Sequence, residues 1–212
     1  MQYKTTKRLF NGKYQYKVVL VSAVAQAFRS KDSAVILKNL QKVQVDPTRK
    51  ESYSTWRGTF VRTQDDIDYA FNLYNTLALL NDINVRVETP WVSVYTNEKS
   101  HVDALVNLDV SKVKYACVPP DTTVLEHGVV IMSKVNFDYK VTLGKTNQEC
   151  SAFVQWAENN PKLKLTKSCK KELSKSKSWG GTFFYITGDN NLLMTKMHLG
   201  GSINKIERII KA

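Results

Sequence analysis

The sequence predicts an α+β protein that contains two copies of one unit, built around mainly antiparallel sheets. Short motifs recur at a fixed spacing along the chain, and within each copy a strand-like alternation of apolar residues is followed by helix-like periodicity. The 212 residues are enough to bury a sizeable core. With 9 glycines and 5 prolines, the composition excludes a collagen-like or low-complexity chain.

The internal repeat rests on two motifs, each of which recurs 123 positions further along the chain. Residues 16–20 read YKVVL and residues 139–143 read YKVTL, while residues 56–60 read WRGTF and residues 179–183 read WGGTF. We therefore expect Tyr16 and Tyr139, and likewise Trp56 and Trp179, to occupy equivalent positions. The chain then divides into a first unit at residues 1–90, a strand–helix–strand connector at residues 91–125, and a second unit at residues 126–212.

The first unit begins with a predicted hairpin. Asn11-Gly12 marks a two-residue turn, because both residues tolerate a positive φ. The strand that follows places Lys13, Gln15 and Lys17 on one face, and on the other face Tyr14, Tyr16, Val18 and Leu20. Helices are expected over residues 23–41, with a break near residues 30–32, and over residues 65–80, where Thr63 and Asp66 resemble a capping box.

The remaining elements complete the pattern. We expect strands at residues 83–95, 113–118, 129–143 and 203–210, and helices at residues 98–108, 147–159 and 192–199. Thr146 and Glu149 form a capping box for the helix at 147–159, and Gly200-Gly201 ends the last helix. Each unit then reads strand, helix, strand, helix, strand, which indicates two ferredoxin-like or RNA-recognition-motif-like βαβαβ units.

The charge of the chain indicates a polyanionic partner. Thirty-one Lys and Arg residues against 19 Asp and Glu residues give a formal net charge of +12. Residues 1–17 hold five basic residues and no acidic one, including Arg8, Lys13 and Lys17. Residues 162–177 hold one glutamate and seven lysines, which are Lys162, Lys164, Lys167, Lys170, Lys171, Lys175 and Lys177. The lysine run is either a phosphate-binding surface or a solvated charge run.

The aromatic residues of the repeat motifs have two interpretations. The run RGTFV at residues 57–61 resembles the first ribonucleoprotein motif of RNA-recognition-motif domains, one residue short in spacing, in which aromatic rings stack on bases. We favour Trp56, Phe60, Trp179 and Phe183 as core residues, because aromatic side chains bury a large area. A stacking platform beside a lysine patch is the alternative.

A Mg²⁺-dependent nuclease is a second hypothesis. Pro120-Asp121, a spacer, and Asp138-Tyr139-Lys140 match the Pro-Asp, Asp/Glu-x-Lys nuclease signature. In that case Asp121 and Asp138 would hold the metal and Lys140 would orient a water molecule. In the repeat, however, Lys140 falls at the position of Lys17, which fits an outward polar strand face better than a metal site.

Other chemistry is sparse. The three cysteines are odd in number and well separated, which favours a reducing compartment, and the histidines lack zinc-ligand spacing. The apolar run at residues 18–25 imitates a secretory signal, but its counterpart around Val141 is internal, so we interpret both as strands. No apolar run is long enough to span a membrane. We expect a cytoplasmic protein, or one in the cytoplasm of a virus-infected host.

We favour a non-enzymatic nucleic-acid-binding accessory protein that contacts phosphates through the two basic clusters and needs no cofactor. Its small, basic, Lys-, Asn- and Tyr-rich composition gives it a phage-encoded character. Two alternatives stay open: the nuclease, which requires Mg²⁺, and an assembly subunit whose lysines bind an acidic protein partner. The sequence does not separate DNA from RNA as the ligand.

The lysine run generates a first prediction. Replacing Lys164, Lys167, Lys170 and Lys171 together with neutral residues is expected to weaken nucleic-acid binding, because each phosphate contact adds about 0.7–0.9 to the salt slope. Fold stability should change little, since exposed lysines contribute little to it. Titrations at several salt concentrations check this, and unchanged binding at low salt would exclude the segment as the site.

Overall fold

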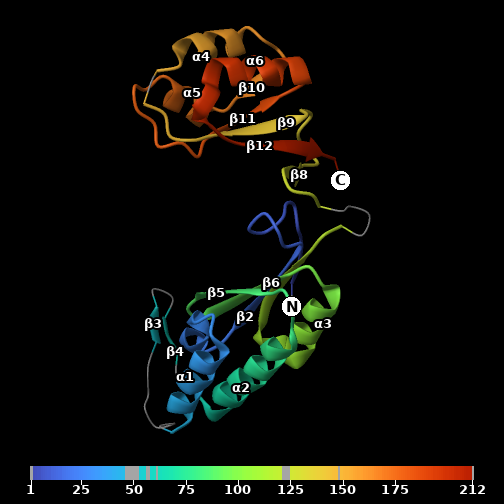
Figure 1. The fold of residues 1–212 in the computed structure, drawn as a ribbon, viewed down its shortest axis with the longest axis vertical. Coiled ribbons are helices and arrows are strands. Elements are labelled where there is room, and N and C mark those ends of the chain that lie inside the picture. Colours follow the sequence, from blue (N-terminus) through green and yellow to red (C-terminus); the bar gives the residue numbers. More distant parts are fainter. Residues whose placement is uncertain are drawn as a thin grey trace. The chain divides into compact units, whose positions relative to one another are not determined.

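Figure 1 shows the computed structural model, which describes residues 2–45, 53–55, 58–60, 62–120, 125–147 and 149–211. The chain divides into two compact units, Met1–Leu125 and Glu126–Ala212. In each unit, the helices among the described residues pack on one face of a five-stranded sheet and leave the other face without a helix (Figure 1). We call this second face the helix-free face. In the part of the chain that the structure describes, no helix is long and apolar enough to cross a membrane.

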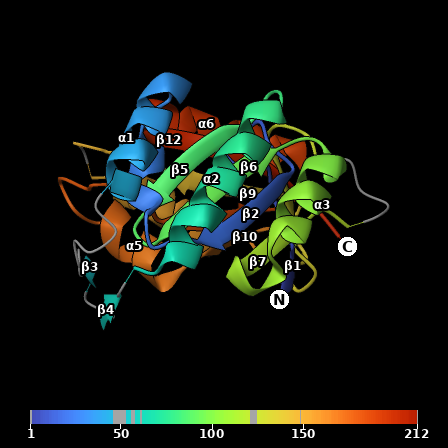
Figure 2. The same cartoon turned by 90° about the horizontal axis from the view of Figure 1, so that it is seen from below.

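The sheet of the first unit has the strand order β1-β7-β2-β6-β5. Its strands are β1 (Tyr3–Thr5), β2 (Tyr16–Val21), β5 (Asn84–Glu88), β6 (Trp91–Thr96) and β7 (Val113–Val118). Its helices are α1 (Ser33–Val45), α2 (Gln64–Leu79) and α3 (Lys99–Leu108), with short 3₁₀ helices at Ala25–Arg29 and Val110–Lys112. Figure 2 looks through these helices onto the sheet behind them. A separate two-stranded ladder joins β3 (Tyr53–Thr55) to β4 (Gly58–Phe60).

The sheet of the second unit has the order β10-β11-β9-β12-β8. Its strands are β8 (Val129–Ile131), β9 (Tyr139–Leu143), β10 (Leu163–Leu165), β11 (Phe183–Ile186) and β12 (Ile203–Ile210). Its helices are α4 (Ser151–Glu158), α5 (Lys167–Leu173) and α6 (Asp189–Leu199), and a 3₁₀ helix at Gly200–Ser202 precedes β12.

Both sheets have the ferredoxin-like arrangement. Four strands lie in the order β7-β2-β6-β5 in one unit and β12-β9-β11-β10 in the other, with antiparallel neighbours. In chain order this is 4-1-3-2 in each unit. Each unit adds a short strand, β1 or β8, parallel to the last strand. The expected α+β fold with duplicated, mainly antiparallel units is therefore confirmed.

Strand register identifies the equivalent residues of the two units. Val18 of β2 pairs with Val94 and Ala116, and Val141 of β9 pairs with Phe184 and Ile206. Tyr16 and Tyr139 accordingly begin equivalent central strands, as predicted. From the third strand onward the spacing between equivalents is 90 positions, so that α3, which begins at Lys99, corresponds to α6, which begins at Asp189.

The second repeat motif does not mark equivalent positions. The segment at residues 58–60 forms β4, outside the five-stranded sheet, whereas the segment at residues 179–183 leads into β11 within it. Trp56 and Arg57 lie outside the described residues. The first unit has 76 positions between Val18 and Val94, against 43 between Val141 and Phe184, so one constant spacing cannot relate the whole units.

The segment at residues 91–125 belongs to the first unit. It supplies β6, α3 and β7, and β7 pairs with the central strand β2. The expected strand at residues 83–95 is a hairpin of β5 and β6, with its turn at Thr89-Pro90. The expected strand at residues 129–143 is likewise two strands, β8 and β9, which both pair with β12.

One of the two predicted capping boxes is present. In α2, Thr63 Oγ1 accepts from Asp66 N at 3.3 Å and Thr63 N donates to Asp66 Oδ2 at 3.0 Å, so this capping box is confirmed. The helix predicted from residue 147 begins only at Ser151, because Thr146 exchanges backbone hydrogen bonds with Ser178 instead. The break at residues 30–32, between the 3₁₀ helix and α1, is present as predicted.

Asp66 also joins α2 to the segment before β7. Its Oδ1 lies 2.6 Å from Lys112 Nζ. Burial acts to raise the pKa of Asp66, but the hydrogen bonds from Lys112 and Thr63 outweigh it and hold the pKa below its usual value. The ionised carboxylate therefore stabilises the fold, in full at every pH above the pKa that Asp66 has in the unfolded chain.

We predict that Asp66→Asn lowers the free energy of unfolding by about 1–2 kcal/mol at neutral pH, because a cap and a charged hydrogen bond are lost. The folded-state pKa lies below the unfolded one, so this contribution is complete above the unfolded pKa and disappears as the pH falls through the folded one. Urea unfolding of both proteins across acidic pH measures it. A difference that persists at the lowest pH would contradict the assignment.

Candidate nucleic-acid interface

The helix-free face of the second unit carries aromatic rings and a lysine in mutual contact. The Tyr185 ring of β11 stacks on Phe137, with centroids 5.7 Å apart and planes at 21°, and meets Phe183 edge-on at 5.6 Å. Lys140 of β9 holds its ammonium group 4.3 Å from the centroid of the Phe183 ring. We call Phe137, Lys140, Phe183 and Tyr185 the aromatic–lysine cluster.

Strand alternation places the cluster on this face. Phe184 and Ile186 of β11 are fully buried in the core under the helices, as is Val141 of β9. Successive side chains of a strand point to opposite faces, so Phe183, Tyr185 and Lys140 project from the other side. All three are only half-buried. The pattern FFYI at residues 183–186, aromatic at every second position on the third strand of the fold, was the signal that sequence reasoning did not use.

The prediction that the repeat aromatics fill the core is wrong for the second unit. Phe183 lies on the helix-free face, and Trp179 is 75% exposed. The side chains of Trp56 and Phe60 lie outside the described part of the chain. The described part of the segment that resembles a ribonucleoprotein motif, Gly58–Phe60, forms β4, which pairs with β3 outside the five-stranded sheet.

The lysines at residues 162–177 do not form one surface. Lys164 of β10 pairs in register with Tyr185, and its neighbour Leu163 is buried, so Lys164 lies beside the cluster. Lys167, Lys170 and Lys171 lie on α5, which packs into the core on the helix-covered side (Figure 1). Lys164 and the lysines of α5, although close in sequence, therefore lie on opposite sides of the sheet.

Part of this lysine run is neutralised by carboxylates. Lys170 Nζ lies 2.7 Å from Glu158 Oε1, and Lys175 pairs with Glu172. The hydrogen bonds from Lys175 and Ser178 hold the pKa of Glu172 below its usual value. Within the described ranges, five lysines form no ion pair: Lys162, Lys164, Lys167, Lys171 and Lys177.

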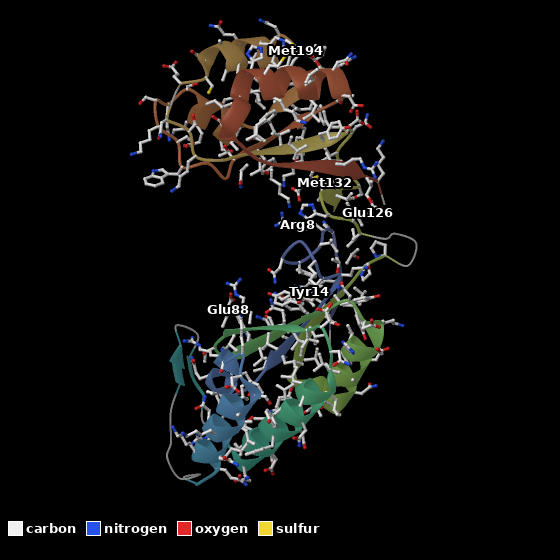
Figure 3. The ribbon with its side chains drawn as sticks, in the orientation of Figure 1. Arg8, Tyr14, Glu88, Glu126, Met132 and Met194 are labelled. Atoms are coloured by element: carbon white, nitrogen blue, oxygen red, sulfur yellow. The ribbon has the colours of Figure 1, made fainter. Side chains whose placement is uncertain are left out.

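The first unit repeats the cluster in a covered form. Tyr14, Lys17 and Tyr95 stand at the positions of Phe137, Lys140 and Tyr185, and Lys17 Nζ lies 5.3 Å from the Tyr95 centroid. Ser93 replaces Phe183, while the rings of Tyr14 and of an additional residue, Phe10, pack on Tyr95. Tyr95 is consequently 6% exposed. Tyr14, labelled in Figure 3, lies before β2 and also lines a pocket with Ile36 of α1 and Leu77 of α2.

The basic N-terminal hairpin is present but short. Asn11 and Gly12 have the expected positive φ, 53° and 71°, but the single bridge between Phe10 and Tyr14 encloses a loop of three residues instead of the predicted two. Lys13 pairs with Asp82, and this hydrogen bond raises the pKa of Lys13. Lys17 belongs to β2, and Arg8 precedes the bridge and is exposed. The hairpin therefore does not place Arg8, Lys13 and Lys17 on one strand face.

Of the three nuclease residues, the structure describes Asp138 and Lys140, and each has a different partner. Asp138 Oδ2 accepts a hydrogen bond of 2.8 Å from the backbone of Gly188, and Lys140 lies over Phe183. Asp121 lies outside the described residues, and among those described no group of three or more His, Cys, Asp or Glu side chains could hold a metal ion.

The thiols are poor nucleophiles. Cys117, Cys150 and Cys169 are all buried, and burial raises the pKa of each, in the case of Cys169 to about 11. A thiol reacts as its thiolate, so a raised pKa disfavours covalent chemistry.

Comparisons with protein-family models, with curated proteins and with solved structures found no match to this chain.

The two clusters differ in what they contribute to stability. We predict that Tyr95→Ala lowers the free energy of unfolding by about 3 kcal/mol, because it empties a buried site. Tyr185→Ala should cost about 1 kcal/mol, the scale of one partly exposed aromatic pair. Urea unfolding monitored by circular dichroism compares them. Equal losses would show that Tyr185 has a structural role like that of Tyr95.

Proposed function

We propose that this protein binds single-stranded nucleic acid, without catalysing a reaction, on the helix-free face of its second unit. The rings of Phe183 and Tyr185 stack on bases, and Lys140 and Lys164 contact the phosphates. The observation that carries the proposal is the alternation of half-buried aromatic residues on β11, with Lys140 directly over one ring and Lys164 in register with the other.

The chemistry favours single strands. An aromatic ring stacks on a base of any identity, and such contacts are worth about 1–3 kcal/mol per base, but a base inside a duplex does not expose its face. The net charge of +12 adds a sequence-independent attraction to phosphates. We place the protein in the cytoplasm, which the three buried cysteines support, because none of them forms a disulfide with the residues that the structure describes.

A protein-interaction function is the second candidate, and one observation favours it. α6 exposes Leu193, Met194 and Met197, and Figure 3 shows Met194 directed away from the sheet. The equivalent residues of α3 are Asp103, Ala104 and Asn107, so the fold itself does not require apolar side chains there. Binding to such a surface would depend weakly on salt, unlike binding to phosphates.

Fluorescence anisotropy of labelled single-stranded oligonucleotides tests the proposed function. We expect the Phe183→Ala/Tyr185→Ala double variant to lose at least about tenfold in affinity, and Lys140→Ala or Lys164→Ala to reduce the salt slope by about 0.7. A duplex of the same sequence should bind more weakly.

Lys170→Ala is the matched control, because Lys170 lies on α5 and is already paired with Glu158. Its affinity and salt slope should remain close to those of the unmodified protein. Binding that depends on Lys170 as much as on Lys164, or that prefers the duplex, would contradict the proposed function.

A further inference from the structure

Trp179 is exposed without a reason in the packing of its unit. Its side chain is 75% exposed, although an indole ring gains more from burial than most side chains. The neighbouring Ser178 is 4% exposed, so the backbone at this point is held close to the unit while the indole is left in solvent. The loop therefore presents the ring rather than burying it.

Hydrogen bonds hold the backbone on both sides of Trp179. Ser178 and Thr146 exchange two backbone hydrogen bonds, of 2.9 and 3.1 Å, and Ser178 Oγ donates to Glu172 Oε2 at 2.7 Å. On the other side, Gly181 N donates to Leu143 O at 2.8 Å. The ring thus stands on a fixed loop, so little conformational entropy is lost when it binds a ligand.

Gly180 allows the loop to approach the chain after β9. Its φ is +77°, and a Cβ at this position would lie 2.4 Å from the carbonyl carbon of Gly144. No other residue fits such an approach. The two glycines bring Lys145, which follows Gly144, next to the Trp179 ring.

Two lysines flank the exposed ring. The ammonium groups of Lys145 and Lys177 lie 5.2 and 5.7 Å from the Trp179 centroid. Neither forms an ion pair with the residues that the structure describes. An exposed ring with two unneutralised cations near it matches one nucleotide step, in which a base lies next to charged phosphates.

The Trp179 loop continues from the strand that carries the cluster. Only four positions separate Trp179 from Phe183, which is at most about 14 Å of extended chain. The hydrogen bonds from Gly181 N to Leu143 O and from Leu143 N to Thr182 O extend the β9–β11 pairing up to the loop. A strand of a few nucleotides therefore reaches from one ring to the other.

We infer that Trp179 is a second base-stacking site, at which Lys145 and Lys177 contact the flanking phosphates of the same single strand that binds Phe183 and Tyr185. This inference rests on the proposed function. It assigns a stacking role to a residue outside the sheet face and makes the bound strand run from β11 onto the loop.

Tryptophan fluorescence of the full chain, titrated with an oligothymidylate of about 16 nucleotides, tests this inference. Binding is expected to quench the fluorescence. Trp179→Ala should weaken binding by about tenfold, whereas Trp179→Phe should keep most of the affinity, because a ring remains, and lose most of the quenching. Leu193→Ala is the control: Leu193 is 59% exposed in the same unit but lies on α6. Melting temperatures of all variants should agree, since Trp179 buries little.

Three other results would contradict the inference. If Trp179→Ala binds as the unmodified protein does while Phe183→Ala binds more weakly, Trp179 does not contact the bound strand and the proposed function stands. If Trp179→Ala and Leu193→Ala weaken binding equally, the effect is not specific to the ring. If the unmodified protein binds no oligothymidylate at all, the proposed function and the inference fail together.

Discussion

The alternation of side chains along the two central strands is the constraint on which the rest of the structure depends. Val18 and Leu20 of β2, and Val141 and Leu143 of β9, turn toward the helices and are almost completely buried. The residues on either side of each buried one must then face the other way. Lys140, which precedes Val141 in β9, therefore meets the aromatic side chains of β11 on the helix-free face.

The duplication provides an internal comparison of the two faces. Both units keep a tyrosine on the third strand, a lysine beside it and an aromatic residue before the central strand. In the first unit Ser93 stands where the second has Phe183, and Phe10 adds a ring over Tyr95. The first copy therefore uses its aromatic residues as a small core under the hairpin, while the second leaves them accessible. Under the proposed function, this difference distinguishes a structural copy from a ligand-binding one.

The sequence predicted what local chemistry controls. The capping box at Thr63, the positive-φ turn at Asn11-Gly12 and the glycine stop after α6 are set by neighbouring residues, and all three are present. The box at Thr146 failed because Ser178, distant in sequence, competes for its backbone. The WRGTF and WGGTF motifs match in sequence and spacing, but Phe60 and Phe183 lie in different elements, β4 and β11. The reason is that the first unit has more residues between its central strand and the strand equivalent to β11. The aromatic–lysine cluster needed the sheet register, which no short motif contains.

The central claim is that bases stack on the helix-free face of the second unit. Photo-crosslinking of a single strand containing 4-thiothymidine, followed by peptide mapping, tests it most directly, because crosslinks form where a base touches a side chain. The structure predicts crosslinked peptides that contain Phe183 and Tyr185, with Tyr95 unmodified because its ring is covered. Crosslinks confined to α5, or to the first unit, would contradict the account.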